Sequence, residues 1–82
     1  MDPLIGLEAL IESGGVDAVD QARALLNSIA GRPKIVAYAI DEFLIEMMTL
    51  AFLADSGRET LQTSARRMAR YRLHRLKLLL VT

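Results

Sequence analysis

Cysteine and tryptophan are absent from this chain of 82 residues, which has a single histidine, His74. Without cysteine, the chain can form no disulfide, no thiol nucleophile and no cysteine-ligated zinc or iron-sulfur site. A reducing, cytoplasmic compartment is the default for this composition. The first residues, Met1 to Leu4, include no basic side chain, and no run of about 18 apolar residues is free of charge. We therefore expect neither a secretory signal nor a membrane span.

Strand signals are also missing, because β-branched and polar residues do not alternate and no Asn-Gly or Asp-Gly turn occurs. Instead, 52% of the residues are hydrophobic, and 5 glycines and 2 prolines divide the chain into segments with helical spacing. The sequence predicts one all-α domain over residues 1–82, with helices at about 3–13, 16–30, 33–55 and 57–80. We expect a compact array of two short and two long helices, completed as a helical-bundle homodimer.

The helix ends are read from local signals. Asp2 and Pro3 form a typical helix start, and the Gly14-Gly15 pair stops the first helix. The second segment runs to Ala30 before Gly31. A Ser-x-x-Glu pattern from Ser56 to Glu59 fits a capping box, which places the N-cap of the fourth helix at Ser56.

The third helix has an apolar arc that covers about half of its circumference, more than the stripe of an ordinary one-sided helix. Such an arc requires more than one neighbour, and the two preceding helices are short. We therefore expect the same helix of a second chain to complete it in a two-fold contact. The predicted oligomer interface consists of Ile40, Phe43, Leu44, Met47, Met48, Leu50 and Ala51.

The fourth helix separates a leucine-rich face from a basic face. The basic face, the candidate contact for a partner or a nucleic acid, comprises Arg66, Arg67, Arg70, His74 and Lys77. Arg72 instead falls within the apolar stripe. Because an unpaired buried charge is costly, we expect Arg72 to form a buried ion pair with Glu42 and Glu46, or else to extend its charge to the rim.

Charge divides sharply along the chain. Residues 1 to 57 carry nine acidic and three basic side chains, a net charge of −6, and residues 58 to 82 carry one acidic and seven basic side chains, a net charge of +6. A basic helix attracts phosphates, anionic lipid or an acidic protein face. The sequence favours a small regulatory or adaptor protein that contacts a protein partner through a charged helical surface. The main alternative is a dimeric nucleic-acid-binding regulator that uses the basic fourth helix. Membrane-surface association is a third option.

Catalytic chemistry has little support in this sequence. Glu42 and Glu46 could offer two carboxylates to a divalent metal, but the Glu-x-x-His ligands of ferritin-like sites are missing. The only histidine, His74, has no carboxylate nearby in the sequence to orient it as a base, and no glycine-rich phosphate loop is present. We therefore predict no enzyme activity, no cofactor and no resident metal, although a carboxylate site shared across a dimer is a further possibility.

Overall fold

A computed structural model describes residues 3–27 and 33–80, and within these residues it contains four α-helices and no strand. The helices are α1 (Pro3–Ser13), α2 (Val16–Asn27), α3 (Lys34–Ser56) and α4 (Glu59–Leu80). The all-α prediction is confirmed. The predicted bounds that fall on described residues agree with these to within two residues. The predicted end of the second helix at 28–30, and the predicted N-cap Asp2, lie outside the described residues.

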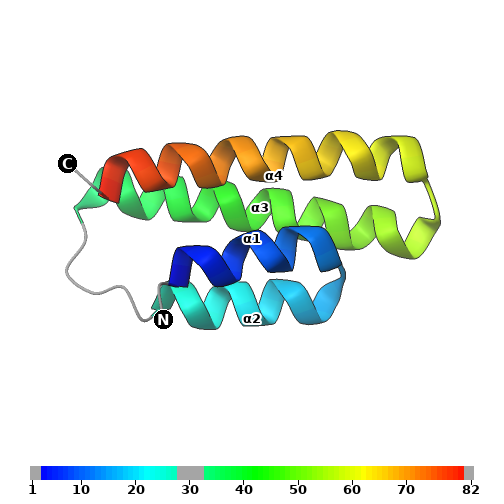
Figure 1. Cartoon of the computed structure of the whole chain (residues 1–82), viewed down its shortest axis with the longest axis horizontal. Coiled ribbons are helices and arrows are strands. Elements are labelled where there is room, and N and C mark those ends of the chain that lie inside the picture. Colours follow the sequence, from blue (N-terminus) through cyan, green and yellow to red (C-terminus); the bar gives the residue numbers. More distant parts are fainter. Residues whose placement is uncertain (1–2, 28–32, 81–82) are drawn as a thin grey trace.

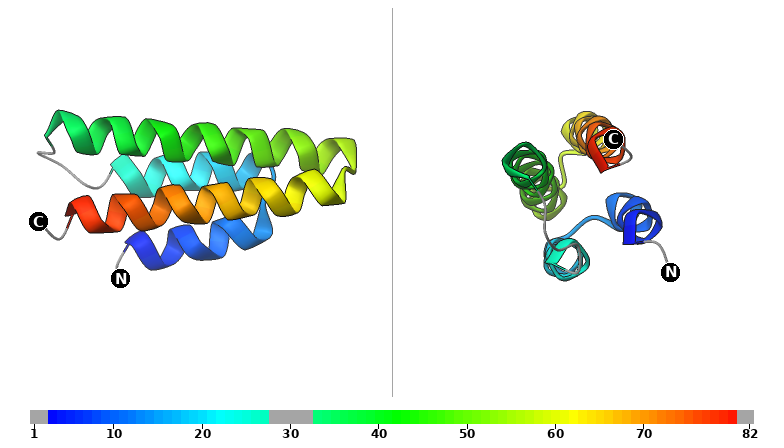
Figure 2. Two further views of the ribbon diagram at one scale, coloured as in Figure 1. Left: turned by 90° about the horizontal axis from the view of Figure 1, so that it is seen from above. Right: turned by 90° about the vertical axis from the view of Figure 1, so that its left-hand side faces the viewer.

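The four helices form an up-down-up-down bundle, in which each helix is antiparallel to the next (Figure 1). In the end-on view of Figure 2 they occupy the four corners of the bundle, with α4 beside α3 and α1, and α2 beside α1 and α3. The molecule measures 38 × 19 × 19 Å. Because α1 and α2 are short, the ends of α3 and α4 next to their connection extend beyond the α1–α2 turn (Figure 1).

Glycine ends both helices that stop at this end of the bundle, α1 and α3 (Figure 1). Gly14 adopts φ 63° and its amide donates to the carbonyl of Leu10 at 2.9 Å. Gly57 adopts φ 71° in the left-handed region, and its amide donates to the carbonyl of Ala54. An L side chain rarely adopts such values, so glycine is the residue that lets each helix stop in a tight turn.

The capping box predicted at Ser56 is wrong. Ser56 is the last residue of α3, and its hydroxyl donates back to the carbonyl of Leu53 at 3.0 Å. The helix stop provided by Gly57 takes precedence over the N-cap pattern, and α4 begins at Glu59. In this connection, Ser56 therefore completes the preceding helix and does not start the next one.

A single cluster of apolar side chains from all four helices forms the core. Its buried members are Leu7, Ile11, Ala18, Val19, Ala22, Leu26, Val36, Ala39, Ile40, Phe43, Met47, Ala51, Ala69, Leu73 and Leu76. Among the described residues, no polar or charged side chain is fully buried. Phe43 is the largest of the fully buried side chains and lies near the middle of α3.

The α3 residues predicted as an oligomer interface lie mostly inside the bundle of a single chain. Ile40, Phe43, Met47, Leu50 and Ala51 are buried, and Leu44 is partly buried against the core. The physical reason is that α2 and α4 both contact α3 within the same chain. Helix α4 packs beside α3 along its length (Figure 1). Of the seven residues, only Met48 is exposed. An interface on α3 must therefore use the opposite side of this helix.

Candidate functional site

The basic face predicted on α4 is divided between contacts to α1 and solvent. Arg66 is half-buried and reaches the C-terminal end of α1, where its Nε donates to the carbonyl of Ile11 and its Nη2 to the carbonyl of Glu12, each at 3.3 Å. The last carbonyls of a helix have no partner within the helix and carry the negative end of its dipole. Arg66 is therefore a cap for α1.

Two further basic residues of α4 pair with carboxylates of α1. Arg70 forms an ion pair with Glu12, and Lys77 forms one with Glu8. Both pairs lie along a groove of about 530 Å³ between the two helices, which His74 also lines. The side of α4 that faces α1 thus has its charge offset within the chain, and His74 shares the groove with two carboxylates that are already paired.

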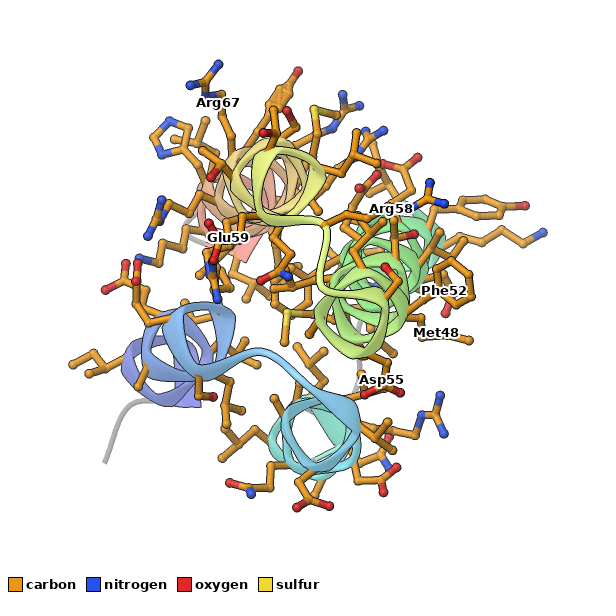
Figure 3. The ribbon with its side chains drawn as sticks, turned by 90° about the vertical axis from the view of Figure 1, so that its right-hand side faces the viewer. Met48, Phe52, Asp55, Arg58, Glu59 and Arg67 are labelled. Atoms are coloured by element: carbon orange, nitrogen blue, oxygen red, sulfur yellow. The ribbon has the colours of Figure 1, made fainter. Side chains whose placement is uncertain are left out.

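The outward side of α4 retains free cations. Arg67 points away from the other helices (Figure 3). Arg75, which is absent from the predicted basic face, is also exposed. Neither forms an ion pair with any residue in the described part of the chain. These two arginines, together with the exposed ring of Tyr71, are what α4 presents to an anionic partner.

Arg72 pairs with the two carboxylates that the sequence indicates. Its Nη1 lies 3.0 Å from Oε2 of Glu42, and its Nε lies 3.8 Å from Oε1 of Glu46. The three side chains are partly exposed, at 27%, 45% and 19% respectively. The contact is therefore a half-buried bridge between α3 and α4 within one chain, at the edge of the core.

The most exposed apolar surface lies on the side of α3 that faces away from the core. We call it the outer face of α3, and its side chains are 52% to 72% exposed. It consists of Ile35, Tyr38, Ile45, Met48 and Phe52.

The helical repeat aligns the members of the outer face. Tyr38, Ile45 and Phe52 are spaced seven residues apart, so each lies within about 20° of the next around the helix. Figure 3 shows Met48 and Phe52 projecting away from the bundle. A shallow, largely apolar hollow lies on this side of the helix. It is lined by Ile45, Met48, Thr49 and Phe52. The outer face is thus a row of apolar side chains along a single helix, with the exposed Asp41 between Tyr38 and Ile45.

The described residues contain no cluster of three or more histidine, aspartate or glutamate side chains able to hold a metal ion. Within the same residues, no helix combines the length and the apolar character that crossing a bilayer requires.

No protein-family model, no curated protein and no solved structure matches the chain.

Proposed function

We propose that the protein is a non-catalytic contact protein, a small cytoplasmic adaptor or regulator, that works through the outer face of α3 and self-associates as a homodimer. The observation that carries the proposal is the row of five large apolar side chains that remain 52% to 72% exposed. Soluble monomers rarely expose contiguous apolar patches of this kind unless the patch binds something. A complete core elsewhere in the chain leaves these side chains without an internal role.

The chemistry of the outer face suits protein contact. Phe52, Met48 and Ile45 supply aromatic and flexible aliphatic anchors that gain free energy when a partner removes them from water. Asp41 lies beside them on the same helix, is exposed, and offers a charge that orients a partner during docking. This assignment moves the working surface from the basic side of α4 to α3, because Arg66, Arg70 and Lys77 already contact α1.

A photocrosslinker tests this assignment. Phe52 is replaced by p-benzoylphenylalanine, which keeps an aromatic ring at the position, and the protein is irradiated in the cells that produce it. We expect a covalent product with a partner chain, because the ring of Phe52 is 72% exposed on the proposed contact surface. The control carries the same group at Arg23, an exposed position on α2. Equal yields from the two positions would show that the outer face has no partner.

Nucleic-acid binding is the second candidate, and the free guanidinium groups of Arg67 and Arg75 favour it. Phosphate contacts make affinity fall steeply with salt, so labelled duplex DNA is titrated at about 50 and 200 mM salt. We expect weak binding that is unaffected in Arg67→Glu, because two free arginines neutralise few phosphates. Binding at micromolar concentration or tighter that is steeply salt-dependent and lost in Arg67→Glu would instead establish the second candidate.

A further inference from the structure

We propose that the outer face of α3 is covered by the same face of a second copy, with the two α3 helices antiparallel about a two-fold axis at Ile45. This inference rests on the proposed function, because it names the occupant, orientation and register of that contact. The spacing of the exposed side chains and the charges at the two ends of the helix support it.

The exposed side chains are arranged symmetrically about Ile45. Tyr38 precedes it by seven residues and Phe52 follows it by seven, and all three lie along one line of the helix. An isologous contact requires that residue i meets residue j and that j meets i. In an antiparallel pair with its axis at Ile45, each Ile45 meets its own copy and each Tyr38 ring meets Phe52 of the second copy. Both aromatic side chains thereby gain an aromatic neighbour.

The charges at the ends of α3 oppose its own dipole. Lys34 lies in the first turn, where a helix favours anions, and Asp55 lies in the last turn, where it favours cations. Both side chains are exposed, and neither forms an ion pair with another described residue. In Figure 3, Asp55 lies at the edge of α3 nearer α2, next to the side from which Met48 projects.

An antiparallel second copy corrects both mismatches. With the axis at Ile45, Lys34 of one chain lies within one residue of the level of Asp55 of the other, and the contact occurs twice. Each lysine then also lies near the negative C-terminal end of the opposite α3, and each aspartate near a positive N-terminal end. The unfavourable end charges of one chain thus become complementary charges of the pair.

A parallel pair would place like charges opposite one another. Asp41 and Lys34 would each face their own copy across the contact, which is destabilising. In the antiparallel register, Asp41 is instead level with Thr49 of the second copy. The charge pattern therefore selects the antiparallel orientation.

Single-cysteine crosslinking tests the register directly, because the chain has no cysteine of its own. Packed helices lie about 8 to 10 Å apart, so residues on the two-fold axis are within the reach of a disulfide. We expect Ile45→Cys to form a crosslinked dimer under mild oxidation. The matched variants Tyr38→Cys and Phe52→Cys should not crosslink alone, since their copies are about 21 Å apart along the helix, but a mixture of the two should crosslink.

Charge exchange tests the proposed end contacts. Lys34→Asp and Asp55→Lys should each raise the dimer dissociation constant about tenfold, because each variant disturbs two symmetric contacts. The double variant restores opposite charges and should return to within about threefold of the parent chain. Sedimentation equilibrium over about 1 to 300 μM covers the range in which a modest helix-pair interface dissociates.

The results separate this inference from the proposed function. Crosslinking at all three cysteine positions would overturn the antiparallel register. A chain that sediments as a monomer throughout would overturn both the second copy as occupant and the proposed self-association. Capture of a different protein from position 52 would then leave only the contact role of the outer face standing. If the chain is monomeric and position 52 captures no protein, both the second copy as occupant and the proposed function are refuted.

Discussion

Phe43→Ala lowers the free energy of unfolding by about 3 to 5 kcal/mol, whereas Phe52→Ala, nine residues later on the same helix, changes it by about 0.5 kcal/mol or less. Phe43 is 0% exposed and lies in the core cluster, and Phe52 is 72% exposed on the outer face. Truncating the buried ring loses its transfer free energy and leaves a cavity between helices that cannot fully collapse. Truncating the exposed ring loses little in the isolated chain.

The expected loss at Phe43 is large compared with the stability of a small domain, which starts at about 5 kcal/mol. Urea unfolding followed by circular dichroism measures it, at a protein concentration low enough for the chain to be monomeric. Phe52→Ala serves as the matched control, and at higher concentration it should weaken self-association. If Phe52→Ala were the more destabilising of the two in the monomer, Phe52 and not Phe43 would be the ring that packs in the core.

The helices could be predicted from local signals because each signal acts within a few residues. Gly14 and Pro33 mark a stop and a start that the structure places within one residue of the predicted positions. The exception is Ser56, where one short segment carries both an N-cap pattern and a glycine stop. Which of the two signals prevails depends on the path of the chain toward α4, and a local sequence pattern carries no information on that path.

The contacts of α3 could be predicted only in part. The partners of Arg72 followed from the need to pair a charge in an apolar stripe, and Glu42 and Glu46 are its neighbours. The division of the apolar arc into core residues and exposed residues could not be predicted, because an arc that covers half of a helix has no clear boundary between core and surface. Ile45 and Phe52 share a line with Tyr38, and this seven-residue spacing is the signal in the sequence that could have indicated the outer face.

The contacts between the basic face of α4 and α1 could not be predicted for a related reason. A helical wheel displays the charges of one helix, whereas Glu8 and Glu12 lie at the opposite end of the chain. The charge split of −6 and +6 between the two parts of the sequence is therefore partly resolved within the molecule, as α1 pairs with α4. Long-range charge complementarity helps to specify which helices become neighbours in this bundle.

Arg66→Met lowers the free energy of unfolding by about 1 to 2 kcal/mol, whereas Arg67→Met leaves it nearly unchanged. Arg66 donates two charge-assisted hydrogen bonds to the last carbonyls of α1, at Ile11 and Glu12. Methionine retains most of the apolar stem, so the substitution removes the guanidinium contacts with little loss of side-chain volume. Urea unfolding of the two variants in parallel measures the difference.

Comparing Arg66 with Arg67 also tests whether the basic face of α4 stabilises α1 or is free to contact a partner. Arg66 closes the end of α1, near the point where Gly14 turns the chain toward α2, so its loss should loosen the α1–α2 hairpin before the rest of the bundle. Hydrogen exchange should show faster exchange in α1 of Arg66→Met while α3 stays protected. Equal stability of Arg66→Met and Arg67→Met would mean that both arginines are surface charges, and the basic face would then be available as a whole to an anionic partner.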